Sequence, residues 1–252
     1  MKDTPYPKTG LFLRGRLRDA MTDREKDLLE SCIESTESFT GEHTLLKRGQ
    51  VYEQSTMVIS GFLLRTMHAD DRRHIVCLHV PGDFVDLHAF ALKRLDHDIE
   101  VLGETTVGYV SHEKLQDILQ NEPHLARLLW FSTLLDAAIH REWILKMGQL
   151  RTSARLAHLF AEIWRKLEMV GLARKDGFLS PLRQVELADI CGASPIHVNR
   201  ALRELREANI VDFRRGRAIV HDRAALERLG RFDPDYLYGE GDLRMQGELS
   251  AD

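Results

Sequence analysis

Residues 178–222 read FLSPLRQVELADICGASPIHVNRALRELREANIVDFRRGRAIVHD. The part from 182 to 190 suits a short helix, and Cys191-Gly192-Ala193 suits a tight turn. Ser194 can then cap a second helix, which has a proline at its first position and runs to about Asn209. Apolar residues recur on one side of each helix, so the two helices can share one small core. The stretch therefore predicts a helix-turn-helix.

A basic hairpin follows the second predicted helix. The apolar pairs 210–211 and 219–220 flank the segment FRRGRA, which predicts two short strands with a glycine-containing tip. The outward face of the helix carries polar groups that can reach base edges or phosphates in a DNA major groove, and its first peptide amides can bind a phosphate oxygen. Any one of these side chains could be an ordinary solvated residue, but together they predict a winged helix-turn-helix. The candidate DNA-binding residues are Ser194, His197, Asn199, Arg200, Arg203, Arg214, Arg215 and Arg217.

The charge of the chain is unevenly distributed. The whole sequence of 252 residues has a formal net charge of -4. Residues 151–221 contain 13 Lys and Arg against 8 Asp and Glu, a net charge of +5, whereas the rest of the chain carries -9. A local positive surface on an acidic protein fits a nucleic-acid module joined to a domain with another task.

The segments before residue 123 predict a domain of mixed helix and strand. Residues 11–38 show helical spacing of apolar residues, with Thr22 placed to cap a helix through Glu25. From about residue 41 to 111, short segments rich in Val, Ile, Leu, Thr and Tyr are separated by glycines, which predicts an antiparallel sandwich or barrel. The segment AFALKRLDHD, residues 89–98, interrupts them as a short helix or a loop over the barrel, and Ser111 opens a further helix.

A long helix is predicted between residues 124 and 148, where no Pro and, before Gly148, no Gly occurs. Its surface is too apolar for a helix with one buried face, so we expect it to pack against its own barrel and against the same helix of a second subunit. The alternative is a helix buried inside a monomer. The candidate dimerisation residues are Leu128, Leu135 and Ile139. A further helix is predicted from 152 to 170 and ends at Gly171.

From about residue 28 to 222 the chain resembles the Crp/Fnr superfamily of bacterial regulators. The resemblance is carried by VISGFLLR and VPGDFVDLH in the strand region, by the long helix, and by ELADICGASPIHVNRALRELREANIV. By position the chain keeps Ser194 and Arg200 of the cyclic-AMP receptor branch. It has Pro195 and Ile196 where that branch has Arg and Glu, so its target sequence should differ.

This resemblance implies an α+β fold, with an N-terminal antiparallel β-roll that is cupin-like and similar to cyclic-nucleotide-binding domains, a long dimerisation helix and a C-terminal winged helix-turn-helix. It implies a sequence-specific DNA-binding transcription regulator that binds an inverted-repeat operator as a homodimer and works with RNA polymerase. The expected parts are a sensory domain at 1–122, the dimerisation helix at 123–150, the DNA-binding domain at 151–230, and a C-terminal tail at 231–252 that is poorly ordered near its end.

The resemblance also bears on the effector. The cyclic-nucleotide branch holds phosphate and ribose with a Gly-Glu pair and an Arg-Ser pair, but here Asp86-Leu87 and Asp98-Ile99 stand at about those places. A phosphate would face carboxylates without a guanidinium, so we expect that cyclic AMP is not the effector. Residues 1–30 lack the cysteines of the iron-sulfur branch, which sets that cofactor aside as well.

Histidines are frequent in the strand region, and a haem or a metal would use such groups. His88 and His97 flank the segment AFALKRLD and could be ligands or pH-sensitive groups, but none of the histidines has a spacing that selects a metal. We therefore predict hydrogen-bonded structural histidines and no metal site. The effector stays unknown, with haem or another small molecule left open.

The sequence does not favour a disulfide-stabilised protein, a metal-knuckle protein, an enzyme or a membrane protein. Cys32, Cys77 and Cys191 are too scattered for a disulfide framework or a metal knuckle, and are expected to be reduced and mostly buried. Catalytic motifs are missing, so no enzyme is predicted. Without an apolar run or signal peptide, we expect a cytoplasmic protein and no membrane partner. The alternative function is a ligand-, haem- or redox-sensing module that mainly binds an effector, which would leave the helix-turn-helix without a role.

Overall fold

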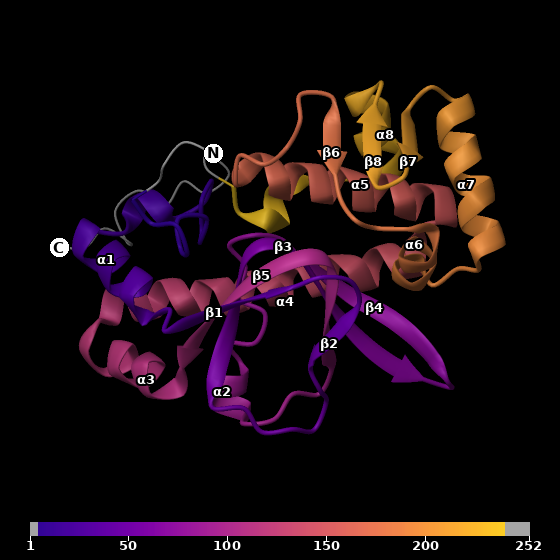
Figure 1. Ribbon diagram of the computed structural model, residues 1–252. Coiled ribbons are helices and arrows are strands. Elements are labelled where there is room, and N and C mark those ends of the chain that lie inside the picture. Colours follow the sequence, from indigo (N-terminus) through magenta and orange to yellow (C-terminus); the bar gives the residue numbers. More distant parts are fainter. Residues whose placement is uncertain (1–4, 240–252) are drawn as a thin grey trace. The chain divides into compact units, whose positions relative to one another are not determined.

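The computed structural model describes residues 5–239, which divide into two compact units (Figure 1). The second unit comprises Thr66–Cys77 and Ala138–Leu237, and the first unit comprises the other described residues. Helix α4, Pro123–Gln149, contributes residues to both. The domain boundaries predicted at 122, 150 and 230 lie at helix ends, and they stay a prediction.

The larger sheet is antiparallel and has the order β1-β5-β3-β4, with β2 also paired to β5. It belongs to the first unit, except that Thr66–Cys77 of the β3–β4 hairpin belongs to the second. Phe39 at the end of β1 pairs with Thr105, and Ser35 at its start pairs with Tyr109. The α+β class and the β-roll predicted from the sequence are confirmed. The elements are η1 Arg18–Ala20, α1 Asp23–Cys32, β1 Ser35–Phe39, β2 His43–Leu46, β3 Gln54–Ala69, β4 Arg72–His79, α2 Ala89–Leu92, β5 Asp98–Ser111 and α3 His112–Asn121.

The longest strand, β3, passes very close to β5 at Gly61. Gly61 has a φ of +83°, and a Cβ on it would lie 2.3 Å from the carbonyl oxygen of Glu104. Only glycine fits such a position without displacing the neighbouring strand. The roll interior is filled by buried aliphatic side chains such as Val58, Leu63 and Ile99, each of which contributes about 1.5 to 3 kcal/mol through the hydrophobic effect.

The predicted helix over residues 11–38 is only partly correct. Its central part is α1, which begins after Thr22 with a capping box in which the Thr22 backbone N–H donates to Glu25 over 2.8 Å. Residues 11–17 form turns instead, because Leu13 and Gly15 have φ values of 52° and 69°. A helix cannot continue through left-handed residues. The residues after Glu34 join the sheet as β1.

The second unit combines helices with a sheet in the order β6-β8-β7 (Figure 1). The short strand β6, the helix α8 and the turn η2 were not predicted. The tail predicted for 231–252 is described to residue 239, and its remainder lies outside the described residues. The elements are α5 Thr152–Met169, β6 Gly177–Leu179, α6 Gln184–Cys191, α7 Pro195–Glu207, β7 Val211–Arg214, β8 Arg217–Val220, α8 Arg223–Gly230 and η2 Pro234–Leu237.

Between residues 5 and 239, no helix is both long and apolar enough to cross a membrane. The three cysteines, all within that range, are free and buried.

Candidate nucleic-acid interface

The helix-turn-helix of the second unit is formed by α6 and α7. Helix α6 ends at Gly192, which adopts a left-handed conformation with a φ of 56°. Ser194 then caps α7, accepting a 3.4 Å hydrogen bond from the backbone N–H of His197, and Pro195 occupies the first helical position. The Ser194 hydroxyl also lies 2.8 Å from Nδ1 of the His197 ring. These two candidate DNA-binding residues are therefore bound to each other in the free chain.

Helix α7 presents one face to the core and the other to solvent. Its buried residues are Val198, Ala201, Leu202 and Leu205. With 3.6 residues per turn, the middle of the opposite face carries Ile196, Arg200 and Arg203, and Ile196 is 80% exposed. A large apolar side chain held in solvent at the start of such a helix has no packing role within the described part of the chain.

The arginines on this face have partners that DNA can replace. Arg200 Nε lies 3.3 Å from Glu204, and Arg203 Nε lies 3.9 Å from Glu207, each one helical turn away. All four side chains are exposed, and such surface pairs contribute only about 0.2 to 1 kcal/mol. Their guanidinium groups can therefore turn towards an incoming phosphate or base at little cost.

The wing is the hairpin of β7 and β8, as predicted. Arg215 and Gly216 form its two-residue turn with φ values of 49° and 75°, as in a type I′ turn. A Cβ on Gly216 would lie 2.0 Å from the carbonyl oxygen of Ser180. Arg214 pairs with Asp212 over 3.1 Å and Arg217 with Asp176 over 3.2 Å. Arg215 has no ion-pair partner among the residues that the structure describes.

A polar groove of about 580 Å³ separates α7 from the wing. From α7 it is lined by Asn199 and Arg206, and from the wing by Arg214 and Arg215. Arg183 and Gln184, at the start of α6, also line it. Three of these residues, Arg183, Gln184 and Arg206, are not among the candidates predicted from the sequence. The signal for Arg206 was its spacing, since it lies two turns after Asn199 on the same side of the helix.

The tip of the β3–β4 hairpin contacts the helix-turn-helix within the second unit. Arg73 Nε donates to Asp189 over 2.8 Å, and its guanidinium lies 3.6 Å from Glu186, both on α6. Glu186 also pairs with Arg183 over 2.6 Å. Although burial acts in the opposite direction, the hydrogen bonds from Arg183 lower the pKa of Glu186. Charged contacts therefore join α6 to strand β4 through Arg73 and stabilise its first turn through Arg183.

Helix α4 buries the side chains that the sequence analysis assigned to a dimer interface. Leu128, Leu135 and Ile139 are all covered within the single chain, with at most 6% exposed. Dimerisation and its contact residues stay a prediction, and the single-chain burial favours contacts through other residues of the helix. The exposed apolar side chains of the helix are Trp130, Leu134, Ile144, Leu145 and Met147.

In the first unit, the residues expected at the places of the cyclic-nucleotide contacts have partners within the chain. Asp86 is completely buried and accepts hydrogen bonds from the Thr56 backbone N–H over 2.6 Å and from the Thr56 hydroxyl over 3.2 Å. Burial raises the pKa of Asp86 to about 7, although the hydrogen bonds and the charge of Arg65 act in the opposite direction. Asp98 accepts a 2.6 Å hydrogen bond from the Arg48 backbone N–H.

A guanidinium lies close to this region, which the sequence analysis did not foresee. Arg65 is 5% exposed and donates to the carbonyl oxygen of Val85 and to the carboxylate of Asp136, each over 2.7 Å. Burial, and then the charge of Arg65, lowers the pKa of His97 to about 4. The charge of Arg65 thus acts on both Asp86 and His97.

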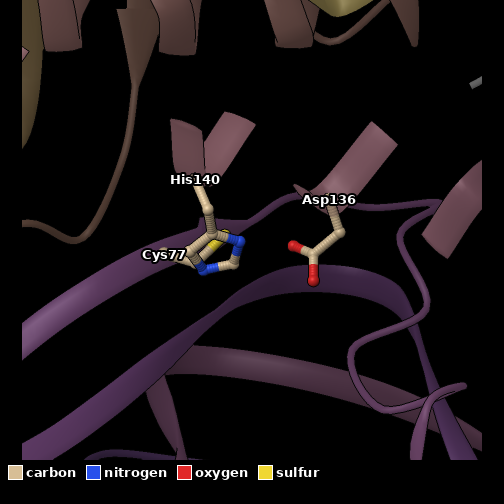
Figure 2. A group of neighbouring side chains, drawn as sticks. All are labelled: Cys77, Asp136 and His140. Carbon is tan, nitrogen blue, oxygen red and sulfur yellow. The ribbon is translucent and has the colours of Figure 1, made fainter. Parts of the chain in front are cut away.

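Two groups of side chains have donor types suited to a metal ion. Figure 2 shows Asp136 and His140, one turn apart on α4, together with Cys77 of β4. The carboxylate of Asp136 is already paired with Arg65, which opposes its use as a metal ligand. The other group is His88, Asp96 and His97 in the first unit.

The comparisons with known proteins agree with this geometry. Residues 154–229 match the model of the Crp-like helix-turn-helix domain. The transcriptional activator protein FnrL of Cereibacter sphaeroides is 26% identical over 214 residues, which cover 82% of this chain and 85% of that protein. FixK2 from Bradyrhizobium japonicum has a TM-score of 0.71 at 22% identity, covering 77% of this chain and 96% of its own.

The regulator CLP of Xanthomonas campestris has a TM-score of 0.64 at 14% identity, covering 80% of this chain and 100% of its own. The solved structures show a shared fold, and the helix-turn-helix match adds the DNA-binding module. The resemblance stated from the sequence is thereby confirmed: residues 154–229 form a Crp-like helix-turn-helix DNA-binding domain, and the chain is similar to transcription regulators of the Crp/Fnr type.

Proposed function

We propose that the protein binds an inverted-repeat operator as a homodimer, with one α7 in the major groove of each half-site. The observation that carries this proposal is the capped helix α7, whose exposed arginines stand across a polar groove from an arginine wing. Two-fold related recognition helices about one DNA turn apart would read the two half-sites. RNA polymerase is the further partner implied by the regulator type.

The candidate residues divide into two kinds of DNA contact. Arg200 and Arg203, in the middle of the exposed face, are placed to read base edges, with Asn199 beside them at the groove. Ser194 and His197 at the start of α7, together with its first amides, suit a phosphate. Arg214, Arg215 and Arg217 belong to the wing and suit the sugar-phosphate backbone.

Replacing Arg200 by Ala should cost about 1 to 3 kcal/mol on the operator and relax discrimination at one base position per half-site. Replacing Arg215 by Ala should weaken binding to all sequences nearly equally and reduce the salt slope by about one unit. The operator is first selected from genomic fragments at a stated salt concentration, and salt-titrated binding to it and to random DNA is then compared. Equal loss on both DNAs for Arg200→Ala, with altered base preference for Arg215→Ala, would reverse the assignment.

Ile196 is expected to read the methyl group of a thymine, because it is an exposed apolar side chain in the middle of the recognition face. Changing each operator thymine singly to deoxyuridine removes only that methyl group. At one position per half-site, the affinity should fall several-fold, since burial of a methyl group contributes about 1 kcal/mol. In Ile196→Ala this sensitivity should disappear, whereas Arg200→Ala should keep it. Sensitivity that persists in Ile196→Ala would exclude this role.

We also propose that the first unit binds a small effector other than cyclic AMP. The support is the carboxylate of Asp86 at the place of the expected Gly-Glu pair, and the engagement of Arg65 by Asp136 and Val85. Relatives of the same fold include a regulator described as c-di-GMP responsive and a CprK structure in complex with OCPA. These names illustrate that the fold serves different effectors, and the effector of this chain is left open.

A further inference from the structure

The first unit brings two histidines and an aspartate together at the end of the roll. His88 directly precedes helix α2, whereas Asp96 and His97 directly precede strand β5. One donor atom from each of the three side chains lies within 4.8 Å of the other two. The two imidazole rings have their centroids 5.3 Å apart and are tilted by 48°. This spacing brings the three side chains within reach of one ion once the Asp96 carboxylate turns away from Nδ1 of His97.

His97 is an unusual residue in this group because its side chain is buried but incompletely satisfied. It is 4% exposed, and Nδ1 lies 2.6 Å from the carboxylate of Asp96. Nε2 is buried and has no hydrogen-bond partner in the described part of the chain. Buried polar atoms without a partner are rare in folded proteins and call for an explanation such as a missing ion.

The guanidinium of Arg65 would repel a cation in this part of the first unit, but it is already paired with the carboxylate of Asp136 over 2.7 Å.

We propose that His88, His97 and Asp96 bind one divalent ion of a first-row transition metal. Two imidazole nitrogens and one carboxylate oxygen suit zinc, cobalt or iron, whereas magnesium and calcium prefer sites made only of oxygen atoms. The side chain of Asp96 is 78% exposed, so the site has an open side through which an ion can enter and on which water can complete its coordination. The proposal is independent of the DNA-binding assignment.

The test is titration of the untagged, EDTA-treated chain with Co²⁺, followed by the visible absorption of the bound ion and by calorimetry. The wild type should bind one ion per chain at this site, and Zn²⁺ should displace it while Mg²⁺ and Ca²⁺ should not. His88→Gln and Asp96→Asn should each weaken this binding at least about tenfold, the lower end of the effect seen for residues supporting a metal site. Neither residue is fully buried, so both variants should fold.

Matched controls come from exposed residues of the same types. His68 lies near the end of β3, and Asp71 lies in the β3–β4 turn. The variants His68→Gln and Asp71→Asn should bind Co²⁺ like the wild type. Asn tolerates the left-handed backbone that Asp71 adopts with a φ of 58°. The proposal fails if no stoichiometric binding of Co²⁺ or Zn²⁺ occurs, if His88→Gln and Asp96→Asn bind as tightly as the wild type, or if the controls lose as much affinity.

Discussion

Replacing Arg65 by methionine is expected to lower the free energy of unfolding by about 3 kcal/mol, because the change removes one member of a buried ion pair. The Arg65 guanidinium donates to Asp136 and to the Val85 carbonyl oxygen. The side chains of Arg65 and Asp136 are only 6% and 22% exposed. Methionine keeps much of the side-chain volume but leaves a carboxylate and a carbonyl without their donor.

The stability lost in Arg65→Met should depend on pH, and the titration of Asp86 determines whether the loss grows or shrinks as pH rises. Its pKa is raised from 3.8 in the unfolded chain to about 7 in the fold, so the folded state binds more protons between these values and stability falls as pH rises through them. Arg65 opposes this rise in the pKa of Asp86. Without Arg65 the pKa of Asp86 rises further, and the stability of Arg65→Met should continue to fall above pH 7.

Urea unfolding at pH 5 and pH 8 measures both expectations. The deficit of Arg65→Met relative to the wild type should be larger at pH 8. Arg94→Met is the control, because Arg94 is exposed and has no ion-pair partner among the described residues, and it should change stability by less than about 0.5 kcal/mol. A deficit below 1 kcal/mol for Arg65→Met, or one that is equal at both pH values, would contradict this account.

Local signals in the sequence were sufficient for the helix-turn-helix and its wing. Gly192 ends α6, Ser194-Pro195 begins α7, and the turn at Gly216 joins β7 to β8. Each of these features depends on residues within a few positions of each other, so a single sequence reveals them. The N-terminal helix was predicted too long because a local signal was lacking. No neighbouring residue indicates that Leu13 adopts a left-handed conformation, which interrupts a helix.

The contacts that the sequence could not supply are those between distant segments. Arg65 and Asp136 are 71 positions apart, and Thr56 and Asp86 are 30 apart. Hydrophobic periodicity predicts that a side chain is buried, but it does not identify the segment or subunit that buries it. Leu128, Leu135 and Ile139 were therefore assigned to a second subunit, whereas the single chain already covers them.

Replacing Leu134 by glutamate is expected to dissociate the proposed homodimer. Along α4, a stripe of exposed and half-buried positions repeats at alternating intervals of three and four residues, the spacing of a two-stranded coiled coil. Leu134 lies in the middle of this stripe and is 51% exposed, and Trp130 one turn before it is 65% exposed. The stripe consists of Arg127, Trp130, Leu134, Ala137, Arg141, Ile144 and Gly148.

In a parallel dimer, Leu134 of each copy would face its counterpart, so the variant would bring two carboxylates together. Juxtaposed like charges cost several kcal/mol, and a cost of about 3 kcal/mol raises the dimer dissociation constant more than 100-fold. The affinity for a single half-site should be unchanged, whereas the advantage of the full inverted repeat should be lost, because the two recognition helices are no longer linked.

Sedimentation equilibrium, together with binding to one and two half-sites, measures this outcome. The matched control is Leu119→Glu on helix α3, since Leu119 is an apolar side chain of the same type that is 48% exposed but lies outside the stripe. The control should sediment and bind the operator like the wild type. A dimer that persists in Leu134→Glu, or one that is lost equally in Leu119→Glu, would show that the stripe is not the contact between subunits.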